Sequence, residues 1–468
     1  MKPKHQAAPG IISCPAEILD LVFQLLSPAD LRVFGRVNKA FRNYVEPLLY
    51  SKIQWTWLKA ESPPPITLLV RKILCRPQLA TYITNIHFES DTFCRWSFKV
   101  VPKIPFTSEL NEPIAFIRKT GVSYTDLWIQ ELCQGITDAW LALLLAQLPR
   151  LKCLYLSPNF TQQSKLIGMV LRSAIEPAYY GLPDFRHLRD VSFHLRVGDR
   201  SRKKRNDKNT TDVLPFFYLP SIQHLSASIE NPVIFTWPAA HLPVPNLTSL
   251  DLNFVREAHL GQLLSVTQNL KTLRWAWYFD ISVEDQFTTP IVDLDQIDTA
   301  LSHVRDTLTD LTILAECGTG LDPFLPSIKT EGSLKSLVNF NKLKRLQIPL
   351  PFLVGFAQDT TKRLQDVIPR NIEFLVITDN LKQQNQDVAD RTGWPLWEWE
   401  DHVIIDLIRL WLEDWRACTP HLRGITLRLE WTDWELDEWL PETTVQQLRD
   451  LGAQAGVEIE IIDLTDVM

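Results

Sequence analysis

The residue types that most often carry out catalysis are scattered along this 468-residue sequence. Asp293-Leu-Asp295 has the spacing of metal-binding carboxylate pairs, but this tripeptide is common by chance. Gly318-Thr-Gly320 begins like a dinucleotide-binding loop, but Pro323 stands where a third glycine is required. The sequence contains no HExxH motif, no closely spaced Cys/His set and no G-x-S-x-G motif. These patterns predict no catalytic residue, no cofactor and no metal site.

The histidines and cysteines favour the same prediction. His194 and His224 fall on predicted strands, where surface positions are more common than catalytic ones. Cys14 and Cys153 have no activating neighbour in the sequence and are interpreted as packing residues. The seven cysteines are odd in number and form no CxxC motif, which favours reduced thiols. An enzyme whose catalytic groups converge from distant positions stays an alternative.

The overall charge and hydropathy exclude other classes. A net charge of −7 and a pI of about 5.9 disfavour nucleic acid or an anionic membrane as a partner. The longest apolar run, residues 139–146, is far shorter than the roughly 18 residues that a membrane span needs. The N-terminus lacks the apolar stretch of a signal peptide. We therefore expect a cytoplasmic and/or nuclear protein with no membrane segment.

An apolar triplet with the pattern apolar-x-x-apolar-x-apolar recurs through most of the chain. The copies are Ile83/Ile86/Phe88, Leu151/Leu154/Leu156, Leu188/Val191/Phe193, Ile222/Leu225/Ala227, Leu247/Leu250/Leu252, Leu270/Leu273/Trp275, Leu308/Leu311/Ile313, Leu343/Leu346/Ile348, Ile372/Leu375/Ile377 and Leu422/Ile425/Leu427. One strand and one helix cannot bury such a face alone, whereas stacked neighbours bury a continuous one. The recurrence predicts an α/β fold of parallel strands joined by outer helices, over residues 81–468.

This triplet resembles the core of a leucine-rich repeat. Asn159 and Asn380 stand where that family places an asparagine that bonds loop backbone. The spacing is irregular, because Leu247 and Leu270 are 23 residues apart and Ile372 and Leu422 are 50 apart. The longer units leave room for outer helices, predicted over residues 138–148, 257–266 and 399–415. Residues 457–464 are predicted to form a terminal strand or cap.

Residues that alternate with the apolar triplet are predicted to line the concave face of this solenoid. They are Glu89, Tyr155, Ser192, His194, Ser226, Asp251, Asn253, Arg274, Thr312, Arg345, Gln347, Thr378, Thr426 and Arg428. This set is mixed in charge and rich in hydrogen-bonding groups, which suits a protein surface better than a small apolar ligand. The predicted substrate-binding residues among them are Tyr155, His194, Asp251, Arg274, Arg345, Gln347 and Arg428.

Residues 14–50 predict three short helices. Pro15 suits a first helical position and Glu17 the first turn, where a negative charge complements the helix dipole. Ser27 then caps a second helix, with Pro28 in its first turn and Asp30 as its acidic third position. Such a unit is too small to be stable alone and has more apolar surface than it can bury. This combination is typical of a module that docks a partner.

This stretch resembles an F-box. The matching residues are Pro15, Glu17, Ile18, Leu19, Val22, Leu26, Asp30, Leu31, Val37 and Phe41. Cys14 stands where leucine is usual and Phe41 where tryptophan is commoner, and both replacements are apolar. The resemblance, with the repeats that follow, is to F-box proteins with leucine-rich repeats of the type abundant in fungi.

The resemblance implies a substrate-recognition subunit of an SCF-type cullin–RING ubiquitin ligase. The F-box would bind a Skp-type adaptor and through it a cullin, and the solenoid would bind an unknown protein substrate. The expected adaptor-binding residues are Pro15, Ile18, Leu19, Val22, Leu26, Leu31 and Val37, about half of which are expected to pack internally. Such a protein is not itself an enzyme. The alternative is a protein-interaction scaffold that uses both parts outside a ligase.

Two segments depart from the rest. The basic loop 199–209 suggests a nuclear-localisation signal or a solvated insertion. The Trp-rich acidic region 394–440 contains eight of the sixteen tryptophans. It suggests either a pocket for a basic partner or a cap that closes the solenoid. The predicted domain boundaries are 10–52 for the helical module, 53–80 for a linker or helical connection, and 81–468 for the repeats.

Overall fold

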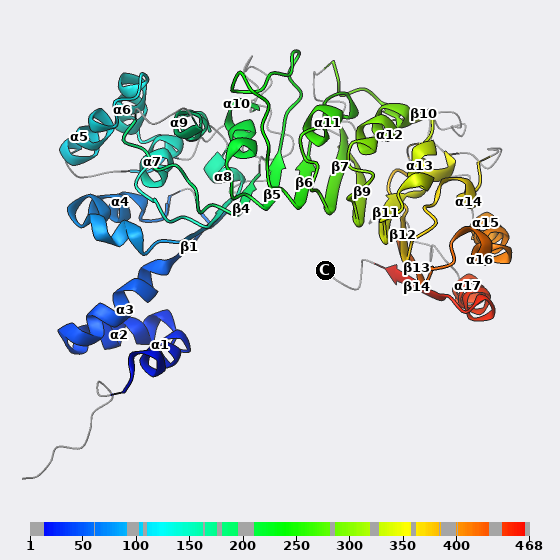
Figure 1. Cartoon of the computed structure of the whole chain (residues 1–468), viewed down its shortest axis with the longest axis horizontal. Coiled ribbons are helices and arrows are strands. Elements are labelled where there is room, and N and C mark those ends of the chain that lie inside the picture. The colour runs from blue at the N-terminus through cyan, green and yellow to red at the C-terminus, as the bar shows by residue number, and fades with distance from the viewer. Residues whose placement is uncertain are drawn as a thin grey trace, which may run out of the picture. The chain divides into compact units, whose positions relative to one another are not determined.

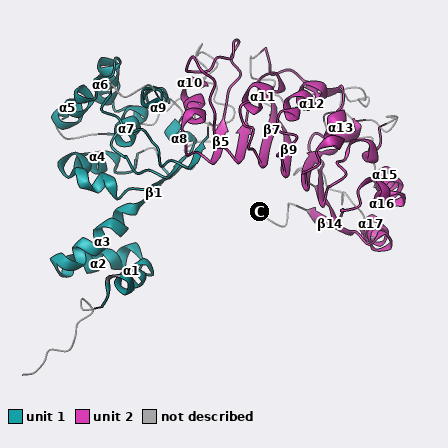
Figure 2. Cartoon of the chain, in the orientation of Figure 1, with its two compact units in different colours: residues 1–195 teal, residues 196–468 magenta. Residues whose placement is uncertain are grey.

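The computed structural model describes residues 14–59, 61–90, 103–105, 110–161, 164–175, 180–194, 210–280, 286–318, 327–356, 362–382, 384, 399, 401–429 and 442–463 (Figure 1). The chain divides into two compact units, residues 1–195 and residues 196–468 (Figure 2). Each unit contains parallel strands with helices along one face.

Unit 1 begins with the three expected helices, α1 (Ala16–Gln24), α2 (Pro28–Val37) and α3 (Lys39–Ser51). Local caps set their boundaries: the Ser27 hydroxyl accepts the Asp30 N–H at 3.2 Å, and the Asn38 side chain accepts the Phe41 N–H at 2.8 Å. The helices enclose a small apolar core. Its buried residues are Leu19, Phe23, Leu31, Phe41 and Val45.

The strand β1 (Lys52–Trp57) follows α3 without an intervening residue. It pairs in parallel with β2 (Asn85–Ser90), which pairs with β3 (Cys153–Leu156), which pairs with β4 (Asp190–Phe193). The register aligns the apolar triplets, because Ile86 lies opposite Leu154 and Leu154 opposite Val191.

Helices occupy the connections between these strands. They are α4 (Ile66–Cys75), the 3₁₀ helix η2 (Pro77–Thr81), α5 (Asn111–Thr120), α6 (Thr125–Cys133), α7 (Thr137–Leu145), α8 (Pro158–Thr161) and α9 (Leu166–Ile175). Every residue of α7 is buried, which explains the uninterrupted apolar run in its sequence.

Unit 2 contains eight parallel strands among its described residues, paired in chain order. They are β5 (His224–Ser228), β6 (Ser249–Asn253), β7 (Thr272–Asp280), β9 (Asp310–Gly318), β11 (Arg345–Pro349), β12 (Phe374–Thr378), β13 (Gly424–Leu429) and β14 (Glu458–Asp463). The register is constant: the central apolar residues from Leu225 through Leu311 to Ile459 lie opposite one another. This in-register stacking is the arrangement of a solenoid.

The connections of unit 2 also contain helices, and two short strands form a second sheet. The helices are α10 (Thr210–Val213), η4 (Leu214–Tyr218), α11 (Glu257–Leu264), α12 (Leu294–Ser302), η5 (Lys335–Asn339), α13 (Leu350–Val354), α14 (Leu364–Val367), α15 (Asp401–Glu413), α16 (Trp415–Cys418) and α17 (Glu442–Ala455). The second sheet pairs β8 (Ile291–Asp293) with β10 (Lys329–Glu331).

The expected α/β class with parallel strands and outer helices is confirmed. Each predicted apolar triplet lies at a strand, and all of its residues are buried. The predicted helices at 138–148, 257–266 and 399–415 correspond to α7, α11 and α15, and the predicted terminal strand to β14. Among the described residues, no helix is both long enough and apolar enough to cross a membrane.

Two features of the structure concern the segments on either side of the predicted domain boundaries. Residues 53–57, which the sequence assigned to a connecting segment, belong to β1 and extend the sheet. Their alternation was the available signal, since Ile53 and Trp57 are buried and the residues between them are more exposed. The division of the chain into two compact units, after residue 195, also falls within the predicted repeat region.

Candidate interaction surfaces

The helical module has an exposed apolar face besides its core. On α1, Ile18 and Val22 are 48% and 38% exposed, and Leu25, the C-cap residue that follows α1, is 88% exposed. These residues lie three or four positions apart, so they share one face of the helix. Leu19 and Phe23 alternate with them and point into the core. The helix is therefore apolar on two faces, of which only one is covered.

The predicted adaptor-binding residues divide between these two faces. Leu19 and Leu31 are buried in the core, and Leu26 is partly buried against it, so all three stabilise the module. Pro15, Ile18, Val22 and Val37 are exposed.

The sequence prediction missed three further exposed apolar residues of the module, which are Leu21, Leu25 and Val33. The sequence signal for them is that these helices have more apolar residues than the single stripe that faces the core requires.

The helical module is joined to the first strands by specific contacts as well as by the chain. The Arg76 guanidinium bonds the Glu46 carboxylate of α3 at 2.7 Å, and Lys72 lies over the Tyr50 ring at 5.0 Å. The Thr84 N–H and hydroxyl both donate to the Ser51 carbonyl, where α3 ends. These contacts attach α3 to the residues around α4 and β2.

The face of the sheet opposite the helices is called the open face. In unit 2, three predicted residues of this face form a chain of contacts across neighbouring strands. The Ser226 hydroxyl donates to Asp251 at 2.9 Å, and the Arg274 guanidinium bonds the same carboxylate at 3.0 Å. The register places these residues side by side on β5, β6 and β7. The structure thus brings Asp251 and Arg274 into contact on this face.

The other predicted residues of unit 2 lie further along the same sheet. Arg345 approaches Asp310 at 3.9 Å and lies over the Phe374 ring at 5.7 Å. Gln347 lies between Thr312 and Val376 in the same row, and Arg428 lies opposite Thr378. Thr378 was predicted to line the binding face, but it is only 2% exposed and therefore belongs to the interior. Phe374, an exposed aromatic residue, was missed.

In unit 1, Tyr155 stacks on His87, with ring centroids 4.2 Å apart and an angle of 10° between the rings. His87 also bonds the Glu89 carboxylate at 2.9 Å. The sequence identified Tyr155 and Glu89 but missed His87, which occupies the same row as Tyr155. His194 follows β4, and its backbone carbonyl accepts a hydrogen bond from the Thr161 hydroxyl.

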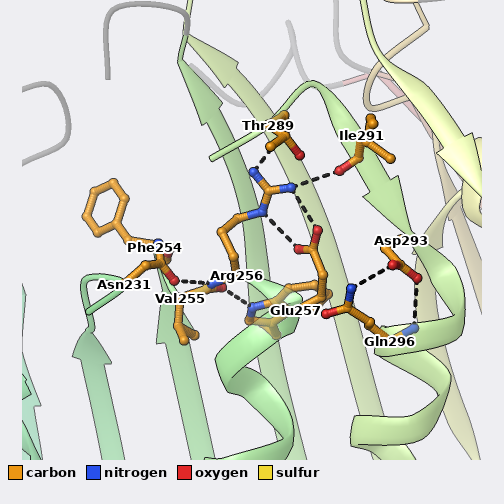
Figure 3. Close-up of polar contacts among 10 residues, drawn as sticks. Asn231, Phe254, Val255, Arg256, Glu257, Thr289, Ile291, Asp293 and Gln296 are labelled. Atoms are coloured by element: carbon orange, nitrogen blue, oxygen red, sulfur yellow. Dashed lines mark hydrogen bonds and ion pairs between the residues drawn. The ribbon is translucent and has the colours of Figure 1, made fainter. Parts of the chain in front are cut away.

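A buried polar cluster, which no sequence pattern predicted, lies just after the end of β6 (Figure 3). The Arg256 guanidinium is bidentate to the Glu257 carboxylate, at 2.8 and 2.9 Å, with its side chain 1% exposed. It also donates to the Thr289 and Ile291 carbonyls and lies over the Trp277 ring at 4.5 Å. These contacts satisfy the charge and hold residues 289–291 against β6.

Asn231 stabilises the same region by bonding backbone groups. Its side chain donates to the Phe254 carbonyl at 3.0 Å and accepts the Arg256 N–H at 2.8 Å (Figure 3). This is the kind of role that the sequence assigned to Asn159 and Asn380. Asn380 accepts a hydrogen bond from the Thr378 hydroxyl at 2.7 Å.

The residues considered for catalysis have structural contacts. Asp293 caps α12 by accepting the Gln296 N–H, and Asp295 accepts the Ser333 N–H. Burial raises the pKa of the Cys153 thiol to about 11 and that of Cys317 to about 12, so both thiols are weak nucleophiles at neutral pH. In the part of the chain that the structure describes, no group of His, Cys, Asp and Glu side chains could hold a metal ion.

Two predicted features lie outside the described residues. They are the whole of the basic loop 199–209 and five of the tryptophans, which are Trp394, Trp397, Trp431, Trp434 and Trp439. Within the Trp-rich acidic region, Trp399, Trp411 and Trp415 are described and buried. The described tryptophans therefore belong to the packed interior.

No protein-family model matches this sequence, and no curated protein sequence matches it either.

Proposed function

We propose that this protein is the substrate-recognition subunit of an SCF-type cullin–RING ubiquitin ligase. In this proposal the exposed apolar face of α1 and α2 binds a Skp-type adaptor, and the sheets bind a protein substrate. The protein forms no covalent bond itself. It holds the substrate close to the ubiquitin-conjugating enzyme and so raises its effective concentration there.

One observation carries the proposal: the helical module exposes apolar side chains although its own core is complete. Leu19, Phe23 and Leu31 are covered, while Ile18, Val22 and Val37 of the same short helices are not. Several large apolar side chains exposed on one small module are typical of a protein interaction site. The resemblance of residues 14–50 to an F-box supports the choice of the adaptor as the partner.

The test is a pull-down of the tagged full-length protein, analysed for the adaptor and for a cullin. We expect both to be recovered with the unmodified chain. Ile18→Glu combined with Val37→Glu should abolish recovery of both, because each change places a charge on the exposed apolar face. Leu19→Ala and Leu31→Ala are unsuitable for this test, since they alter the core of the module.

The chain offers a matched control in Leu68, an apolar residue of α4 that is 63% exposed and lies outside the module. Leu68→Glu should leave recovery of the adaptor unchanged. Failure of the unmodified protein to recover any adaptor would show the proposal to be wrong. Recovery of the adaptor without a cullin would favour the alternative of a scaffold that acts outside a ligase.

A further inference from the structure

The amino-terminal ends of β11, β12 and β13 form a basic surface, here called the basic edge. Its residues are Lys342, Lys344, Arg345, Arg370 and Arg423. Parallel pairing brings their strand ends to one edge of the sheet, since the Glu373 N–H donates to the Lys344 carbonyl and the Arg423 N–H to the Glu373 carbonyl. All five basic side chains are exposed.

The charge of this edge is opposite to that of the whole protein. The segments 341–345, 369–374 and 420–424 contain five Lys/Arg residues and one acidic residue, Glu373, which gives a net charge of 5 − 1 = +4. The complete chain has a net charge of −7. Asp310 on β9 and Glu458 on β14 lie at the two sides of the edge, so the positive charge is confined to three strands.

Carboxylates lie near three of the five basic side chains, which are Lys344, Arg345 and Arg423. The Glu373 carboxylate accepts a hydrogen bond from the Lys344 ammonium at 2.9 Å and lies 3.7 Å from the Arg423 guanidinium. The hydrogen bond from Lys344 lowers the pKa of Glu373, so this carboxylate stays ionised. In the described part of the chain, no carboxylate forms an ion pair with Lys342 or Arg370. Both side chains are therefore available to an incoming anion.

Phe374 adds an apolar element to the same edge. Phe374 lies on the open face of β12, and the residue is 39% exposed. The ring leans over Gly424, because a Cβ atom at that position would be 3.3 Å from Phe374 Cδ1. Arg345 lies over the ring at 5.7 Å. An exposed aromatic ring beside a positioned arginine is the usual composition of an interaction hot spot.

We propose that the basic edge and Phe374 bind an acidic peptide segment that has an apolar side chain among its carboxylates. The carboxylates would pair with Lys342, Arg370 and their neighbours, and the apolar side chain would contact Phe374. Identification of this segment as part of a ligase substrate rests on the proposed function, whereas the binding itself does not. The net negative charge of the chain disfavours nucleic acid as the ligand.

Binding is tested on the full-length protein without adaptor, so that its outcome is independent of the ligase proposal. The probe is a short fluorescein-labelled peptide with Glu residues on both sides of a central Leu, followed by fluorescence anisotropy. We expect binding that weakens as salt is added, and none for the same peptide with Gln in place of Glu. A variant with phosphoserine at some Glu positions tests whether phosphate serves as the anion.

Lys342→Glu combined with Arg370→Glu should weaken binding by about tenfold or more, because two attractive contacts become repulsive. The control is Lys335→Glu combined with Arg449→Glu, which reverses two exposed charges in η5 and α17 and should leave binding unchanged. Phe374→Ala should weaken binding of the Leu peptide by about fivefold and leave a peptide with Ser at that position unaffected.

Three results would overturn the proposal. The first is equal binding of the Glu and Gln peptides. The second is an equal loss of binding in the variant of the basic edge and in its control. The third is binding of single-stranded RNA with no binding of the acidic peptide.

Discussion

The helical module and the parallel sheets differ in how completely they bury their apolar side chains. The module covers five apolar residues and leaves others, such as Leu25 and Val33, in solvent. In the sheets every residue of the apolar triplets is buried, and the open face presents hydrogen-bonding groups such as Ser226, Asp251 and Arg274. Under the two proposals above, the module would bind an apolar surface and the sheets a polar or charged one.

The two regions also differ in what their interiors contain. The described buried residues of the module are all apolar. The sheet units bury charged groups as well, including Asp138 in unit 1 and Arg256 with Glu257 in unit 2. A buried charge is stable only when its partners are fixed, which requires a larger and more rigid environment than three short helices provide.

The largest expected effect comes from the buried ion pair of unit 2. Arg256→Met should lower the free energy of unfolding by about 3–5 kcal/mol, because it leaves the Glu257 carboxylate buried without its partner. Arg256→Met combined with Glu257→Leu should recover much of this loss. The measurement is urea unfolding followed by tryptophan fluorescence, to which Trp275 and Trp277 contribute. Equal destabilisation in both variants would mean that the carbonyl contacts of Arg256 dominate.

Cavity-forming substitutions compare the two cores directly. Leu250→Ala in β6 should cost about 2–5 kcal/mol and shift the unfolding transition seen by tryptophan fluorescence. Leu31→Ala in α2 should leave that transition in place, because the first tryptophan of the chain is Trp55 and no tryptophan lies in the module. It should instead make residues 14–51 more susceptible to limited proteolysis. A shift of the tryptophan transition by Leu31→Ala would show that the module and the sheet unfold together.

Asp138 tests the cost of a buried carboxylate in the helical layer of unit 1. Burial raises its pKa from 3.8 to about 7, although it accepts the N–H groups of Lys165, Leu166 and Ile167. Because the folded state then binds a proton more tightly than the unfolded state, the free energy of unfolding should fall as the pH rises from 3.8 towards 7 and level off above it.

The measurement for Asp138 is the urea midpoint at several pH values for the unmodified protein and for Asp138→Asn. The asparagine does not titrate, so this variant should show a smaller dependence on pH. Asp138→Ala should cost about 2 kcal/mol near pH 4, since it removes the acceptor from the start of α9, and this cost should shrink as the pH rises because alanine does not titrate. Identical pH dependence in the unmodified protein and the asparagine variant would contradict the raised pKa.

The smallest effect is expected on the open face. Arg274→Ala removes an ion pair with Asp251 in which both side chains are partly exposed, and should cost less than about 1 kcal/mol. The measurement is the same urea unfolding. A loss as large as that for Leu250→Ala would mean that the open face contributes to stability as strongly as the core, and the contrast between the two faces would disappear.

The elements of the fold were predictable to a large extent, and the surfaces much less so. The triplet at Leu247, Leu250 and Leu252 predicted a strand with its buried face, because alternation along a strand is a local property. Phe374 and His87 were missed as surface residues. Their exposure depends on the neighbouring strands, where Gly424 leaves space for one ring and Tyr155 stacks on the other.

The sequence alone determined the ten strands with apolar triplets, the positions of those apolar residues, the terminal strand, three of the outer helices and the three helices of the module. These features follow from residue spacing within one element, which needs no knowledge of its neighbours. Only the tertiary structure decided that Leu19 is internal while Ile18 is exposed, and that Arg256 is buried with Glu257. It also brought Lys344, Arg370 and Arg423 to one edge, because parallel pairing joins segments that are distant in the sequence.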